Sequence, residues 1–201
     1  MAKTEIEEKF DYLISKVIWS HFKPLGYKKS GNNFRFYDDT NGWGKIVNFQ
    51  KSMYYNKEHI HFTINIGLFL NDTYLNFGKP PGNKFTEPSC VIRNRIGDLM
   101  NTKDTWYDLT PETDIENFSE NIETIFKKYI LSYLNKYKSK QDIFFALTQK
   151  IRYSVNELEC LFYNGYKKQA LDALEKELKG AKNEHYIQNL LKTKNEFLNN
   201  Q

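Results

Sequence analysis

The residues of this 201-residue chain best suited to recognition chemistry are its arginines, because lysine is its ordinary cation. Lys and Arg together number 29, yet only Arg35, Arg93, Arg95 and Arg152 are arginine. A guanidinium presents a planar fork of N–H donors that matches a carboxylate or a phosphate, which the compact ammonium group of lysine does not. Three of the four arginines lie in segments that alternate as β-strands do, and the strand period places these three on one face.

Amide and imidazole side chains join the arginines on the same predicted sheet face. Arg, Asn and Gln together are typical of a site for a carboxylate, a phosphate or a nucleotide edge. A merely solvated face of this lysine-rich chain should be mostly lysine, so the selection favours a binding face. The alternative stays open, because the uncovered face of any half-buried antiparallel sheet is polar. The predicted ligand- or partner-binding residues are Arg35, Asn48, Gln50, His61, Asn65, Arg93 and Arg95.

Two histidines also share this face. His59 and His61 are two residues apart on a predicted strand, which places them about 6.5–7 Å from each other. Such a pair can ligate zinc when a neighbour supplies a third ligand. No Asp, Glu or Cys is predicted on this face, and Cys90 is predicted on the opposite one. The sequence therefore predicts no metal and no cofactor, and it assigns His61 to hydrogen bonding.

Residues for catalysis are not grouped in any recognisable pattern. Cys90 and Cys160 lie among apolar neighbours, as buried structural thiols do. The chain lacks a Gly-x-Ser-x-Gly motif, a phosphate-cradling glycine loop and a close carboxylate pair on the polar face. We therefore expect a binding protein rather than an enzyme. Trp43, at a predicted hairpin tip, and Trp106 are the candidate contact aromatics.

The elements that must position these side chains follow from the hydrophobic period. A capping box at Thr4 and Glu7 opens an amphipathic helix over 4–22, and a second long helix is predicted over 110–137. Between them, alternation predicts four strands, near 33–37, 45–53, 59–68 and 89–96. The connection over 71–88 is predicted to be an irregular loop. The expected fold class is α+β, a four-stranded antiparallel sheet with helices on one face.

An all-helical module is predicted after this sheet. A polar break near Lys138 suggests two domains, an α+β domain over 1–138 and a helical hairpin module over 139–201. Its helices are predicted near 141–152, 155–163, 166–179 and 183–198. One helical hairpin of tetratricopeptide type cannot form a repeat array by itself. We expect it to pack on the first domain or on a second subunit, which would give a homodimer through the C-terminal helices.

Composition limits the class of partner. Hydrophobic residues make up 40% and aromatic residues 16%, which is enough for a core, and the net charge is only +4. The apolar runs are far shorter than the roughly 18 residues that a membrane span needs. The first residues do not resemble a signal peptide, and two cysteines do not make a disulfide framework. We expect a cytoplasmic protein whose partner is another protein or a small anionic ligand, not nucleic acid or a membrane.

Five short motifs in a fixed order resemble an uncharacterised bacterial family, the domain of unknown function numbered 4304. The resemblance covers about residues 5–137. Its motifs are Gly26–Phe34, Val47–Ser52, Phe62–Gly67, Arg93–Gly97 and Trp106–Tyr107. The resemblance implies no established activity, and it leaves an immunity protein that neutralises a bacterial toxin as one alternative. A second alternative is an enzyme that acts on a phosphate- or carboxylate-bearing substrate at the same face.

Overall fold

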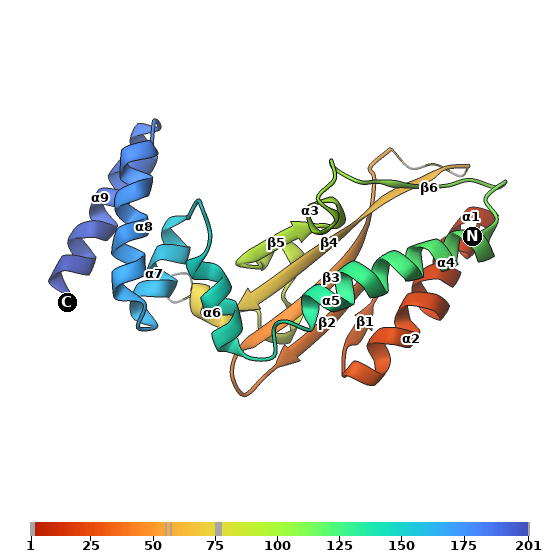
Figure 1. The fold of residues 1–201 in the computed structure, drawn as a ribbon, viewed down its shortest axis with the longest axis horizontal. Coiled ribbons are helices and arrows are strands. Elements are labelled where there is room, and N and C mark those ends of the chain that lie inside the picture. Colours follow the sequence, from red (N-terminus) through yellow and green to blue (C-terminus); the bar gives the residue numbers. More distant parts are fainter. Residues whose placement is uncertain (1–2, 55, 57, 75–77, 201) are drawn as a thin grey trace.

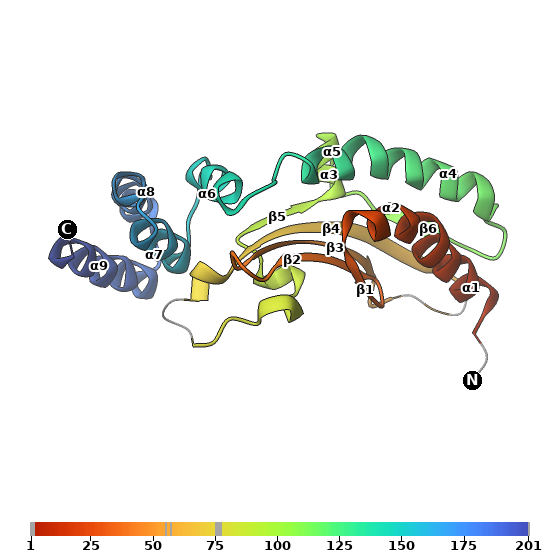
Figure 2. The same ribbon diagram turned by 90° about the horizontal axis from the view of Figure 1, so that it is seen from below.

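The computed structural model describes residues 3–54, 56, 58–74 and 78–200 (Figure 1). One twisted sheet forms the centre of the molecule. Figure 2 shows two long helical segments on one side of this sheet and the connection after β4 on the other side. The helices that follow residue 139 extend from one end of the sheet, so the molecule is elongated. The expected α+β class is confirmed.

The sheet is antiparallel throughout, and its order is β1-β2-β3-β4-β5, with β6 also paired to β4. Its strands in the described residues are β1 (Lys28–Ser30), β2 (Asn33–Asp38), β3 (Trp43–Lys51), β4 (Ile60–Leu70), β5 (Ile92–Arg95) and β6 (Tyr107–Leu109). The second half of β4 pairs with β5 and its first half pairs with β6, along the same edge. The four expected strands correspond to β2 to β5, whereas the two three-residue strands were not expected.

The first helical segment begins where the sequence predicts. The Thr4 and Glu7 side chains form the expected capping box, and α1 (Glu5–Tyr12) continues through a π-helical turn (Leu13–Ile18) into α2 (Trp19–Phe22). Gly26 ends the segment with a φ of 77°, a left-handed conformation that glycine adopts without strain. The apolar stripe of this segment packs on the sheet, where the Phe10 ring meets the Phe62 ring edge-on at 5.2 Å.

The second helical segment begins later than expected. Residues 110–113 form a turn rather than a first helical turn, because the Asp114 carboxylate caps the N–H groups of Glu116 and Asn117. The segment then runs through α4 (Ile115–Ile125), a π-helical turn (Phe126–Leu131) and α5 (Ser132–Leu134). The prediction of a helix start at Thr110 is therefore wrong by about one turn.

The opposite face of the sheet is only partly open. The connection between β4 and β5 contains three short 3₁₀ turns (Asn71–Tyr74, Gly82–Lys84 and Glu87–Ser89) and lies under the C-terminal half of β4. A small second core forms there, made of Ile46, Phe69, Phe85 and Cys90. The Phe69 and Phe85 rings stack at 4.4 Å. Cys90 was expected on the helix-covered face, and this is wrong because β5 begins only at Ile92.

Four helices complete the chain: α6 (Lys140–Thr148), α7 (Val155–Tyr163), α8 (Lys167–Gly180) and α9 (Glu184–Asn199). α7, α8 and α9 match the predicted helices within one residue at each end, whereas α6 ends at Thr148, four residues earlier than predicted. The buried apolar side chains of these helices belong to the same hydrophobic cluster as the core between sheet and helices. The division at residue 138 and the homodimer through these helices stay predictions. Within the described residues, no helix has both the length and the apolar character to cross a membrane.

Because Gly67 lies against Cys90, we expect a larger residue at position 67 to destabilise the protein. A Cβ at Gly67 would lie 2.5 Å from Cys90 Sγ and 3.0 Å from Ile46 Cγ2. We expect Gly67→Ala to lower the free energy of unfolding by about 1–3 kcal/mol, measured by urea denaturation, because the second core is overpacked. The matched control is Gly180→Ala at the end of α8, where an added Cβ meets nothing within 4 Å. An unchanged urea midpoint for Gly67→Ala would contradict this packing.

Candidate functional site

The predicted polar residues lie in transverse rows on the face opposite the long helices. In one row, Asn33, Asn48, Asn65 and Arg95 stand opposite one another on β2, β3, β4 and β5. The Asn48 amide donates to Asn33 Oδ1 at 2.9 Å, and the Asn65 amide donates to Gln50 Oε1 at 2.7 Å. Asn65 is 5% exposed. These side-chain amides therefore hold one another in fixed orientations.

The two arginines of β5 are each paired with a carboxylate. Arg93 donates through Nε and Nη2 to the two oxygens of Glu87, at 2.7 and 3.1 Å. Arg95 Nη1 donates to Asp104 Oδ2 at 2.7 Å. Both acidic residues belong to the connections that flank β5, where the sequence shows no strand period to assign them a face. The expectation of a face almost without acidic residues is therefore wrong.

A shallow depression of about 280 Å³ lies between these groups. Its wall includes both arginines of β5, three amide residues and two carboxylates, namely Gln50, Asn65, Glu87, Arg93, Asn94, Arg95 and Asp98. The Asp98 carboxylate accepts the backbone N–H of Arg95 at 2.6 Å, at the start of α3 (Ile96–Met100). The depression thus offers positively charged donors and negatively charged acceptors in equal number, rather than an excess of positive charge.

Trp106 lies beside this depression in contact with three polar groups. Its indole Nε1–H donates to Asp104 Oδ2 at 3.0 Å, and the Arg95 guanidinium lies 5.6 Å from the ring centroid. The His61 ring stacks on the indole with the two centroids 4.7 Å apart and the planes at 7°. The hydrogen bonds from Trp106 and Arg95 hold the pKa of the Asp104 carboxyl below its ordinary value.

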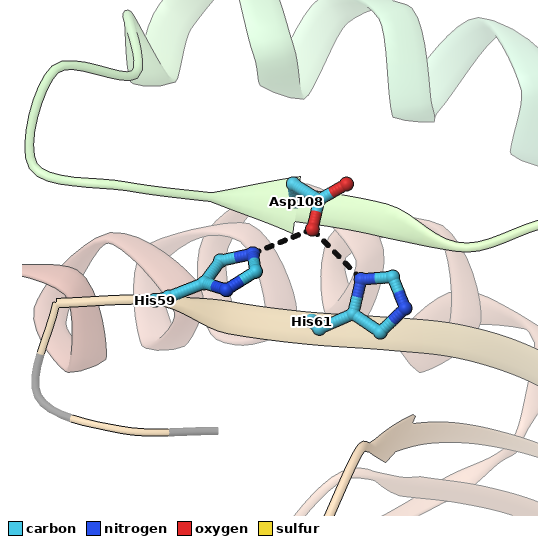
Figure 3. A group of neighbouring side chains, drawn as sticks. All are labelled: His59, His61 and Asp108. Atoms are coloured by element: carbon cyan, nitrogen blue, oxygen red, sulfur yellow. Dashed lines mark hydrogen bonds and ion pairs between the residues drawn. The ribbon is translucent and has the colours of Figure 1, made fainter. Parts of the chain in front are cut away.

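The strand β6 brings Asp108 to the two histidines (Figure 3). Asp108 Oδ1 lies 2.5 Å from His59 Nε2 and 2.7 Å from His61 Nδ1. Burial acts to raise the pKa of Asp108, but hydrogen bonds and charge from His61 and His59 outweigh it and lower the pKa. The prediction that no carboxylate shares the face of the histidines is therefore wrong. The only sequence signal is the apolar–acidic–apolar order of Tyr107, Asp108 and Leu109, which is too short to indicate a strand.

Two of the remaining predicted residues lie apart from this group. Arg35 is on the polar face, but Ile46 stands between it and the residues of β4, and its Nε is buried without a hydrogen-bond partner among the described residues. Trp43 is 3% exposed, and its indole donates to Asp38 at 2.9 Å. The interpretation of Trp43 as a contact aromatic is wrong, because the ring folds onto its own sheet.

The predicted residues that do come together are those of β3, β4 and β5 near Asn65, with His61 at one end of the group. The family model for a domain of unknown function, DUF4304, matches residues 18–136. The match covers more than half of the chain, so the chain belongs to this family, as its motifs predicted. Searches among the curated proteins and among the solved structures found no match.

Because Arg93 and Glu87 form an ion pair, we expect removal of the arginine to destabilise the folded protein. Glu87 is 7% exposed, whereas the Arg93 side chain is 54% exposed. We expect Arg93→Ala to lower the free energy of unfolding by about 1–2 kcal/mol, because a carboxylate is left buried without its partner. Adding Glu87→Gln should restore part of this loss, since a neutral amide costs less to bury. Equal urea midpoints for the single and the double variant would argue against the pairing.

The lowered pKa of Asp104 predicts how its contact with Trp106 responds to acid. The carboxylate should stay ionised below the ordinary pKa of an aspartate, 3.8, and should keep accepting the Trp106 N–H. The indole N–H resonance of Trp106 in ¹H–¹⁵N NMR spectra should therefore titrate with an acidic midpoint below 3.8. Arg95→Ala should raise this midpoint, because one hydrogen bond and one positive charge are lost. A midpoint unmoved by that substitution would contradict the assignment.

Proposed function

We propose that this protein is a binding module that recognises another protein through the surface formed by Gln50, Arg93, Arg95 and Trp106, called here the polar surface. The observation that carries the proposal is the ordered unit of Arg95 and Trp106, both held by the Asp104 carboxylate. Arg and Trp are the residue types that most often dominate binding energy at protein interfaces. Side chains that are already fixed lose little conformational entropy when a partner binds.

The pairing of the arginines favours a protein over a small anion as the partner. A small anion would have to compete with Glu87 for Arg93 and with Asp104 for Arg95. A protein surface can instead hydrogen-bond to the guanidinium N–H groups that these pairs leave free, since each guanidinium carries five donors. The Arg93 and Arg95 side chains are 54% and 41% exposed, so these donors face solvent.

The chemistry of the partner follows from the balance of charge. The depression is lined by two arginines and two carboxylates, and the amides of Gln50 and Asn65 add both donors and acceptors. A complementary surface therefore carries mixed polar groups rather than a block of acidic or basic residues. Such a surface gives specificity through hydrogen-bond geometry, because a mismatched partner leaves buried polar groups unpaired.

A site-specific photo-crosslinker tests this proposal. We expect a crosslinking amino acid at the exposed position 50 to give one discrete protein adduct in cells that express the chain. The same amino acid at Lys16, which is exposed on the π-helical turn after α1, is the matched control and should give no such adduct. The captured protein, once purified, should bind Trp106→Ala at least about tenfold more weakly than it binds the wild type or Lys16→Ala.

Three results would reject the polar surface as an interface. One is the same set of adducts from positions 50 and 16, and another is no protein adduct from position 50. The third is equal affinity of the purified partner for the wild type and Trp106→Ala. Far-UV circular dichroism of each variant shows whether a loss of binding comes from a loss of fold.

A further inference from the structure

His59, His61 and Asp108 form a compact group of nitrogen and oxygen donors at the beginning of β4, next to the polar surface (Figure 3). Their potential ligand atoms all lie within 4.8 Å of one another. His59 Nε2 and His61 Nδ1 both point at Asp108 Oδ1, at 2.5 and 2.7 Å. The three donors are therefore close enough for one small ion to contact all of them after small side-chain movements.

The backbone holds these donors together. His61 stands directly opposite Asp108 in the ladder of β4 and β6, and His59 is two residues earlier, just before β4 begins at Ile60. Residues opposite each other in an antiparallel pair have Cβ atoms about 4.5–5.5 Å apart, and residues i and i+2 of a strand share a face. Strand register therefore brings His61 and Asp108 side by side, and His59 joins them from the residue before β4.

We propose that His59, His61 and Asp108 bind one divalent transition-metal ion, with zinc as the ion that this donor set fits best. Imidazole nitrogen and carboxylate oxygen are ordinary zinc ligands, and three protein ligands leave a fourth tetrahedral position for water. Magnesium and calcium prefer sites made of oxygen ligands, and this group contains a single carboxylate. The proposal goes beyond the binding function above and does not depend on it, because it requires no partner protein.

The geometry leaves room for the ion. Ligands of a tetrahedral zinc ion at about 2.0–2.2 Å are separated from one another by roughly 3.3 Å. The donor atoms must therefore move apart slightly from their present contacts. The side chains of His59 and Asp108 are 43% and 55% exposed, so their rotation meets little resistance from packing, while the His61 ring, 36% exposed, stays stacked on Trp106. The same exposure gives the ion and its water a path from solvent.

Trp106 acts as a positioning residue for the group. Its indole lies parallel to the His61 ring at 4.7 Å, and the hydrogen bond to Asp104 fixes the indole in turn. A ring held in one plane needs less ordering when the metal binds. Loss of this stacking contact should therefore weaken zinc binding.

Titration of the purified full-length chain with zinc chloride alone tests the site. Isothermal titration calorimetry should show one saturable ion per chain, and cobalt chloride should give the visible absorption bands of a four-coordinate ion. We expect His61→Ala and Asp108→Asn each to weaken zinc binding by more than about tenfold. His185→Ala removes a histidine on α9, far from the group, and is the matched control that should leave zinc binding unchanged.

Several outcomes would overturn the proposal. They are the lack of saturable zinc binding to the wild type, binding that His61→Ala and Asp108→Asn leave intact, and a loss as large in His185→Ala. Trp106→Leu separates positioning from ligation, because it should weaken zinc affinity while the stoichiometry stays at one ion per chain. Circular dichroism of the metal-free variants shows whether each has kept its fold. A negative zinc titration would leave the crosslinking test of the polar surface unaffected.

Discussion

The hydrogen-bonding capacity of β4 is the constraint on which the rest of the structure depends. Every residue of this strand except His61 is buried, so the N–H and C=O groups of both its edges need partners. One edge is filled by β3, and the other is divided between β5 and β6, which meet its two halves. The side chains of the polar surface and of the histidine–aspartate group are on β4, on a neighbour of β4, or on a segment that connects these strands.

The sequence could predict those parts of the arrangement in which hydrophobic residues recur with a regular period. The alternation along β2, β3 and β4 placed Asn48, Gln50, His61 and Asn65 on one face, and the register of the sheet confirms that they share it. The helical stripes predicted the layer over the other face. These predictions succeed because a period is sampled several times within one element, so that a single exceptional residue does not hide it.

The rest could not be predicted because its position is set by tertiary contact. Glu87 and Asp104 belong to irregular connections, and Asp108 belongs to a strand of three residues, so no period assigns a face to any of them. Cys90 lies two residues before β5, where the alternation has already stopped, and the space left by Gly67 decides where its thiol packs. The sequence correctly places Arg93 and Arg95 on the polar face. It does not predict their carboxylate partners, which determine how many guanidinium N–H groups remain free for a ligand.

The divided edge of β4 also has a consequence for synthesis of the chain on the ribosome. His61 and Asp108 are 47 residues apart, so one edge of the first half of β4 stays unpaired until β6 has left the exit tunnel. An unpaired apolar strand edge is a template for association with other chains. The group of histidines and aspartate that closes this edge is therefore among the last features of the sheet to form. Pairing with β6 therefore closes this edge of the nascent strand.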